Sequence, residues 1–131
     1  MSLYAKYSDL GDKTPKVDQA QLDAVCPTLR SAEEKNKIIS TNRVVVIDIY
    51  ADWCGPCKAI APQFAEMARK YSRPGVCALV KENVDQKLSQ NIRGVPTFLF
   101  FKEGQYVDSI TGADLTGDEG VEKKLISLLS N

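Results

Sequence analysis

The sequence predicts a single α/β domain in a chain of 131 residues. The apolar runs Val44–Tyr50 and Thr97–Phe101 have the length and the β-branched or aromatic content of buried strands. The segment from Lys58 to Tyr71 instead repeats its apolar residues at helical spacing. Strands that alternate with amphipathic helices are typical of an α/β fold, and a composition of 44% hydrophobic and 26% charged residues is ordinary for a globular protein.

The first elements are expected between residues 25 and 41. Residues 25–30 are the candidate for a short first strand, which Pro27 would confine to an edge of the sheet. Ser31 is followed three residues later by the acid Glu34, which fits a capping box and predicts a helix over residues 31–41.

The central elements come next. After the strand over residues 44–50, a helix is expected over residues 54–71, and Pro62 inside it predicts a kink near Ala59. A third strand is predicted over residues 76–83, and a short helix over residues 86–92.

The chain is expected to end with a hairpin and a helix. Strands over residues 97–101 and 106–111 flank the turn residues 102–105, which include a glycine. A last amphipathic helix is predicted to start at Thr116 or Asp118. Its apolar face would carry Val121, Leu125, Leu128 and Leu129.

Residues 1–24 are predicted to be a loosely attached extension of a domain that spans residues 25–131. They are polar, contain Gly11 and Pro15, and show no clean periodicity. They also lack the apolar core of a secretory signal and the Arg-rich composition of a mitochondrial leader, so we expect a cytoplasmic protein.

The charge balance argues against two classes of partner. Seventeen basic residues match seventeen acidic ones, which gives no electrostatic signature for nucleic acid or an anionic membrane. The apolar runs are too short to span a bilayer. We therefore expect neither nucleic acid nor a membrane as a partner.

The strongest functional signal is a pair of cysteines, Cys54 and Cys57, placed between a predicted strand and a predicted helix. Cys54 would lie at the helix start, where unpaired N–H groups and the macrodipole favour a thiolate. We expect it to be the more exposed thiol and the attacking nucleophile, and Cys57, one turn deeper, to be the resolving thiol. Two packed structural thiols are the alternative. Between them, Gly55 and Pro56 form the first turn, and Pro56 lacks an N–H.

Asp48 is a charged residue inside an otherwise apolar strand. Burial of a carboxylate among aliphatic side chains is costly and should raise its pKa. A carboxyl group with a raised pKa suits proton exchange near neutral pH, although a structural role is the alternative.

Taken together, these motifs show that the chain resembles the thioredoxin family from about Val25 to the C-terminus. The resemblance rests on several spaced features, namely Asp48, the run Ala51 to Lys58 around the cysteines, Pro62, the run Arg93 to Thr97, and Gly112. It implies a central mixed β-sheet flanked by helices on both faces. It also implies a protein-disulfide reductase with a redox-active Cys54–Cys57 disulfide, no bound cofactor, and recycling by NADPH through a flavin-dependent thioredoxin reductase. The Gly-Pro pair between the cysteines goes with reducing members of the family.

The resemblance also implies roles for residues outside the cysteine motif. Asp48 would take the proton of Cys57 through a water, and Lys81 would be the ion partner of Asp48, with a plain surface lysine as the alternative. Pro96 would be cis and face the dithiol, with a trans turn proline as the alternative, and Val95 would offer its backbone to an extended substrate segment. An apolar rim for substrates would comprise Trp53, Gly94, Val95, Gly112 and Ala113, with a core position as the alternative for Trp53.

Substrates expected from the resemblance are disulfide-containing proteins of the peroxiredoxin or ribonucleotide reductase type, and a monomer is expected. A zinc site is disfavoured because the chain has no His and no second Cys-x-x-Cys motif. A redox-silent binding module is the more serious rival, and an isomerase or oxidase would differ only in reduction potential. Outside the motif, Cys77 is expected to be a buried hydrophobe, whereas Cys26 is a candidate for an accessible thiol, and Tyr50 replaces the Trp or Phe of many relatives.

Overall fold

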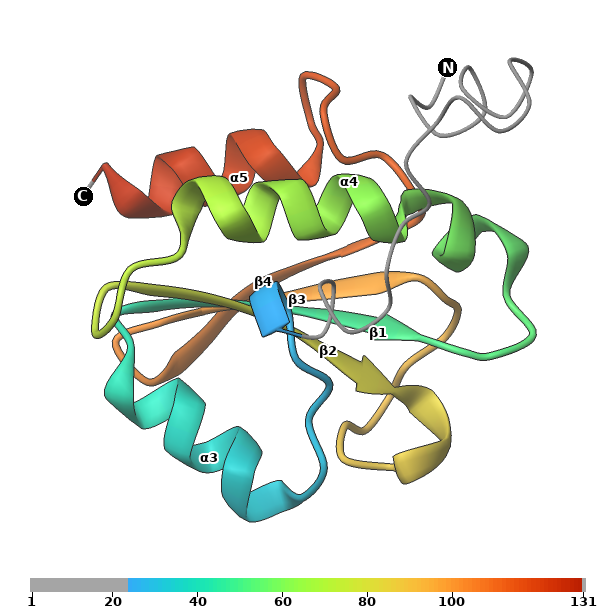
Figure 1. Cartoon of the computed structure of the whole chain (residues 1–131), viewed down its shortest axis with the longest axis horizontal. Coiled ribbons are helices and arrows are strands. Elements are labelled where there is room, and N and C mark those ends of the chain that lie inside the picture. The colour runs from blue at the N-terminus through green and yellow to red at the C-terminus, as the bar shows by residue number, and fades with distance from the viewer. Residues whose placement is uncertain (1–23, 131) are drawn as a thin grey trace.

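The computed structural model describes residues 24–130, which form a sheet with helices on both faces (Figure 1). In chain order the elements are α3 (Ala32–Thr41), β1 (Val44–Tyr50), α4 (Gly55–Tyr71), β2 (Cys77–Asn83), the 3-10 helix η2 (Val84–Gln86), β3 (Thr97–Lys102), β4 (Gln105–Thr111) and α5 (Val121–Leu129). The predicted extension over residues 1–24 lies outside the described residues, except for Ala24. None of the helices described is long and apolar enough to cross a membrane.

Within residues 24–130 the sheet has four strands in the order β2-β1-β3-β4. β1 and β2 are parallel, whereas β1 with β3 and β3 with β4 are antiparallel, so the sheet is mixed. Helices α4 and α5 cover one face and α3 covers the other (Figure 1). This arrangement confirms the predicted central mixed sheet with helices on both faces.

Strand β1 lies between two partner strands, and its alternation assigns each side chain to one face of the sheet. Val44 and Val46 belong to the apolar cluster that includes residues of α4 and α5. Val45, Ile47 and Ile49 belong to the cluster on the α3 side. Asp48 has the same parity as Val46 and therefore faces α4.

The prediction for the first half of the chain is largely confirmed. Ser31 caps α3 and accepts a hydrogen bond from the Glu34 N–H at 3.1 Å, and β1 has the predicted bounds. The predicted strand over residues 25–30 is instead a single bridge from Thr28 to Lys81 on β2. Pro27 has no N–H to donate to a longer ladder, so pairing is limited to its C=O and the Leu29 N–H.

The short helix predicted over residues 86–92 is wrong. Residues Val84–Gln86 form one 3-10 turn, which Asn83 caps by accepting the Asp85 N–H at 2.9 Å. Lys87 then adopts a left-handed conformation with φ of 55°, which ends the helical turn. Asn91 has φ of 63°, so the segment up to β3 is irregular.

The last helix starts later than either residue that the sequence favoured. Its N-cap is Gly120, because the preceding residues fold back on Asp114. The Asp114 side chain accepts the Gly117 N–H at 2.9 Å, and its C=O accepts the Val121 N–H at 3.2 Å. The predicted apolar face is correct, since Val121 and Leu125 are buried and Leu128 and Leu129 pack against the same cluster.

A buried ion pair joins α3 to the sheet. The Glu82 side chain is 1% exposed, and its Oε1 lies 3.1 Å from the Lys35 Nζ. The two groups are close but not aligned as a hydrogen bond, so the contact is electrostatic. Lys35 also donates to the Leu88 C=O at 2.9 Å and to the Ser89 Oγ, which fastens the irregular segment to α3.

Lys35→Met is expected to destabilise the protein by about 3–5 kcal/mol, because it leaves the Glu82 carboxylate buried and unpaired. The free energy of unfolding in urea measures this change. Lys37→Met, at an exposed position of the same helix, is the matched control and should change stability by less than about 0.5 kcal/mol. An equally small effect of Lys35→Met would show that Glu82 does not need its partner.

Candidate functional site

Cys54 and Cys57 are joined by a disulfide at the start of α4. Cys54 is the N-cap residue, and its Sγ accepts the backbone N–H of Cys57 at 3.1 Å. Pro56 occupies the first turn, where a missing N–H costs no helix hydrogen bond. The helix N-terminus therefore directs a backbone donor and its positive end at the sulfur of Cys54.

The two sulfur-bearing residues are equally buried in this disulfide form. Cys54 and Cys57 are each 4% exposed, so the prediction that Cys54 is the more accessible is wrong here. The neighbouring Trp53 is 73% exposed, which excludes a core position for its ring. Gly55 and Pro56 are exposed as well. A substrate can therefore approach the disulfide across the exposed turn at Gly55 and Pro56, beside the exposed Trp53 side chain.

Asp48 lies on the α4 face of β1 and is 2% exposed. Together with Cys57 it lines a cavity of about 380 Å³. Burial raises the pKa of the Asp48 carboxyl group to about 7, and the nearby positive charge of Lys81 partly offsets this rise. Asp48 Oδ1 accepts no hydrogen bond from the described residues. Because its pKa is near 7, the carboxyl group can exchange a proton near neutral pH.

Lys81 reaches this cavity from the neighbouring strand. The parallel register pairs it with Asp48, and its Nζ lies 5.6 Å from the centre of the Tyr50 ring. Both Tyr50 and Thr28 line the same cavity. Sequence reasoning noted Tyr50 only as a departure from relatives and missed Thr28, because the bridge that brings residue 28 beside Lys81 has no local sequence signal.

A second group of predicted residues meets the dithiol from the other side. The peptide bond between Val95 and Pro96 is cis, as the resemblance implied. Val95 packs against the small cluster formed by Ala51, Cys54 and Cys57. The Gly112 N–H donates to the Pro96 C=O at 2.9 Å, which ties residue 112 to the cis-proline segment.

The remaining rim residues are placed by the same two segments. Gly112 has φ of 114°, a conformation that favours glycine, and an added Cβ would meet no atom within 4 Å. Gly94 is half-buried and its C=O accepts the Thr97 hydroxyl, whereas Ala113 is exposed. The predicted rim residues thus come from three loops, one at Trp53, one at Gly94 to Pro96 and one at Gly112 to Ala113.

The cysteines outside the motif lie in the core. Cys77 is 2% exposed, as expected for a buried hydrophobe, and burial raises its thiol pKa to about 11. Cys26 is 1% exposed, so the expectation of an accessible thiol there is wrong. Residues 24–130 contain no cluster of three or more Cys, His, Asp or Glu side chains arranged to hold a metal ion.

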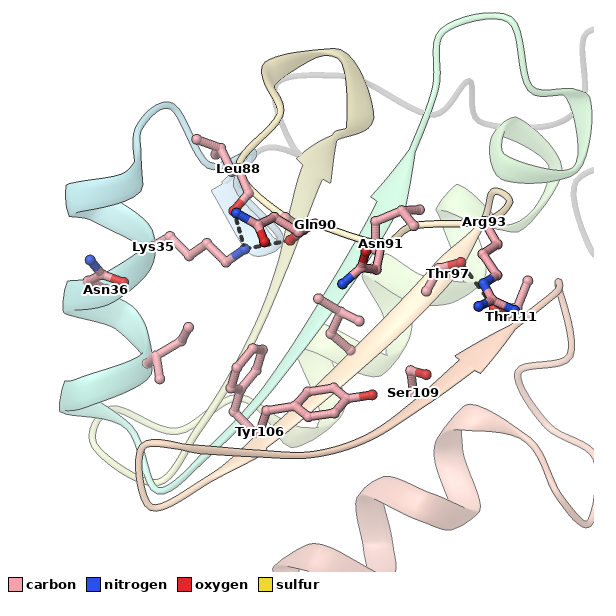
Figure 2. Close-up of a pocket in the computed structure, with 15 residues that line it drawn as sticks. Lys35, Asn36, Leu88, Gln90, Asn91, Arg93, Thr97, Tyr106, Ser109 and Thr111 are labelled. Atoms are coloured by element: carbon pink, nitrogen blue, oxygen red, sulfur yellow. Dashed lines mark hydrogen bonds between the residues drawn. The ribbon is translucent and has the colours of Figure 1, made fainter.

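A larger groove, of about 610 Å³, lies on the α3 side of the sheet and contains none of the predicted site residues. Figure 2 shows Lys35 at one end and Arg93 with Thr97 and Thr111 at the other. The fifteen lining residues include no thiol and no carboxylate. The groove therefore offers no second redox centre and no acid of the Asp48 kind.

The comparisons with known proteins agree with this geometry. A family model described as Thioredoxin matches residues 25–125. The chain is 43% identical over 106 residues to a thioredoxin of Neurospora crassa, which covers 74% of this chain and 84% of that protein.

Two solved structures have the same fold. Oxidised mitochondrial thioredoxin 3 from Saccharomyces cerevisiae has a TM-score of 0.70 at 32% identity, with 82% of this chain and 98% of that chain covered. A chain from a study of thiol resolution in yeast mitochondrial 1-Cys peroxiredoxin via glutathione/thioredoxin systems has a TM-score of 0.61 at 31% identity, with 76% and 92% covered.

Asp48→Asn is expected to stabilise the protein at pH 8 and to have little effect at pH 4. Between the unfolded pKa of 3.8 and the folded pKa of about 7, the native Asp48 keeps a proton that the unfolded chain has lost. The free energy of unfolding therefore falls as pH rises through this window, by on the order of 4 kcal/mol in total.

Urea unfolding at both pH values measures the difference. Asp52→Asn is the control, because the Asp52 side chain is exposed to solvent and its replacement should change stability only slightly. Equal effects of Asp48→Asn at the two pH values would mean that the native carboxyl group titrates like an exposed one.

Proposed function

The chain belongs to the thioredoxin family and is a dithiol–disulfide oxidoreductase that reduces protein disulfides, and on that premise we propose which residues carry each step. The observation that supports the proposal is the Cys54–Cys57 disulfide at the α4 N-terminus, beside a buried carboxyl group with a pKa of about 7. The disulfide is the oxidised end of the cycle, and the reduced dithiol is its starting point.

In the first step the Cys54 thiolate attacks one sulfur of a substrate disulfide. A mixed disulfide forms between Cys54 and the substrate, and the other substrate sulfur leaves as a thiolate that takes a proton from solvent. The N-cap position of Cys54 supports this assignment. In the observed structure the Cys57 N–H already donates to the Cys54 sulfur, and in the dithiol the same donor would stabilise a thiolate there.

In the second step Cys57 resolves the mixed disulfide. The Asp48 carboxylate accepts the Cys57 proton, and the Cys57 thiolate attacks the Cys54 sulfur. The bond between Cys54 and the substrate breaks, the second substrate thiolate leaves and takes a proton from solvent, and Asp48 later releases its own proton to solvent. The pair becomes the disulfide seen here, and the substrate gains two electrons and becomes a dithiol. The cavity of about 380 Å³ that Asp48 shares with Cys57 has room for a bridging water.

The exposed rim is proposed as the substrate-docking surface. Trp53 presents an aromatic face beside the disulfide, and Val95 packs against the cysteine cluster from the cis-proline loop. Gly112 leaves the backbone of its loop open to a substrate strand, Gly94 adds no side chain to the other loop, and Ala113 extends the rim. Strand addition to Val95 would orient an extended substrate segment across Cys54.

We further propose that an NADPH-dependent flavoprotein thioredoxin reductase re-reduces the disulfide, and that the chain works as a cytoplasmic electron carrier. Peroxiredoxin is one candidate substrate class, because one of the similar structures comes from work on thiol resolution in a yeast mitochondrial peroxiredoxin. Ribonucleotide reductase is the other class that we propose. Consumption of NADPH in the presence of a thioredoxin reductase and a disulfide substrate measures the recycling step.

The wild-type protein is expected to accelerate reduction of insulin disulfides by dithiothreitol, and Cys54→Ser should abolish the acceleration. Cys57→Ser should instead accumulate a mixed disulfide between Cys54 and the substrate, which mass spectrometry detects. Cys77→Ala is the matched control, because it removes a buried thiol outside the motif and should retain activity. Activity that survives Cys54→Ser would overturn the assignment of the nucleophile.

Asp48→Asn is expected to slow resolution of the mixed disulfide by roughly one to two orders of magnitude, because an amide cannot accept the Cys57 proton. A stopped-flow measurement on a preformed mixed disulfide isolates this step. The wild-type rate should rise with pH through about 7 as Asp48 ionises, and the variant should lose this dependence. An unchanged rate and pH profile would exclude Asp48 as the proton acceptor.

A further inference from the structure

Three side chains from two strands converge on the wall of the dithiol cavity. Asp48 and Tyr50 are two residues apart on β1, which places them on the same face of the sheet. Lys81 on β2 is paired with Asp48 in the parallel register. Its Nζ lies 5.6 Å from the centre of the Tyr50 ring, and all three side chains line the cavity that also contains Cys57.

We propose that Tyr50 is a positioning residue, whose ring holds the Lys81 ammonium at this cavity so that the ammonium stabilises the carboxylate form of Asp48. The proposal rests on the proposed function of Asp48 as the proton acceptor of Cys57. Tyr50 touches neither the substrate nor a reacting sulfur in this account and acts only through Lys81.

The physical argument starts from the lysine side chain. An ammonium group is strongly hydrated and sits on a flexible four-carbon stem, so its mean position depends on what holds it. The face of an aromatic ring attracts the ammonium, and this attraction is stronger where water is partly excluded. Lys81 is only half-exposed, and the cavity wall on one side of it is the Tyr50 ring.

The Lys81 ammonium stabilises the Asp48 carboxylate, because the charge of this carboxylate is the most costly one to bury in the cavity. The side chain is buried, and its Oδ1 accepts no hydrogen bond from the described residues. The positive charge of Lys81 opposes the desolvation that favours the protonated acid. If the ring is lost, the ammonium samples positions nearer bulk water, and the carboxylate loses part of this stabilisation.

The other titratable or charged groups that face the cavity come from α4 and from the loop before it. They are Cys57, Lys58 and Asp52. Cys57 carries no ionisable proton in the disulfide, and Lys58 and Asp52 are exposed to solvent, which screens their charges. Titration of Asp48 in the oxidised protein therefore reports mainly burial and Lys81.

The test is a double-mutant cycle on the oxidised protein, with the Asp48 carboxyl carbon followed by NMR as pH changes. Tyr50→Leu should make Asp48 a weaker acid by about two- to fivefold in its dissociation constant. Tyr50→Phe keeps the ring and should titrate like the wild type. In a Lys81→Met background, Tyr50→Leu should cause no further change, because the group through which the ring acts is gone.

An equal shift on Tyr50→Leu with and without Lys81 would overturn the proposal, because the ring would then act by packing or desolvation alone. The absence of any shift on Tyr50→Leu in the protein that retains Lys81 would overturn it as well. Tyr50→Met removes the ring and fills a similar volume, so it replaces Tyr50→Leu if that variant does not fold.

A kinetic measurement separates this proposal from the role of Asp48 itself. In Tyr50→Leu the rate of mixed-disulfide resolution should reach half its maximum at a higher pH than in the wild type. The size of this pH shift should match the shift in the Asp48 titration midpoint. A shifted titration with an unchanged rate profile would overturn the role of Asp48 as proton acceptor and leave the link from Tyr50 to Lys81 intact. An unshifted titration overturns the link itself, whatever the rate profile.

Discussion

The structure depends on the enclosure of β1 between two strands and two helical layers. Six of its seven residues are buried, and the alternation of a strand leaves each of them only one face to occupy. Asp48 is thereby committed to the α4 side, where the dithiol lies, and its side chain cannot reach the other face of the sheet. A carboxyl group held in this way has a raised pKa because of where the backbone places it, which makes the chemistry of the site a consequence of strand register.

The parts of the fold that the sequence predicted correctly are those with a strong local signal. A run of seven mostly β-branched residues specified β1, and the Ser31 and Glu34 pair specified the start of α3. The failures have equally local causes that composition does not reveal. A left-handed Lys87 replaced the predicted short helix, and hydrogen bonds to Asp114 delayed the start of α5. In both places side-chain and backbone bonds competed successfully with helix formation.

The candidate site shows the same division. The motif around Cys54 was sufficient to predict a dithiol at a helix start. The resemblance supplied the cis-proline and a lysine that lies opposite Asp48 on the neighbouring strand. Contacts between segments far apart in sequence were not predictable from one chain. Thr28 joins the cavity through a single bridge to β2. The burial of Cys54 depends on a small cluster against which Tyr50, Val84 and Val95 pack.

The burial of the two cysteines outside the motif determines how many electrons one molecule can carry. Cys26 and Cys77 are enclosed in the core, and a thiol pKa of about 11 leaves Cys77 with roughly one thiolate in ten thousand molecules at pH 7. Peroxides and substrate disulfides react with thiolates, so they find only one reactive pair on the described part of the chain. The protein accordingly alternates between two oxidation states, the reduced dithiol and the disulfide of Cys54 and Cys57. Its capacity stays at two electrons in each turn of the cycle, and its core thiols are spared from cross-linking one molecule to another.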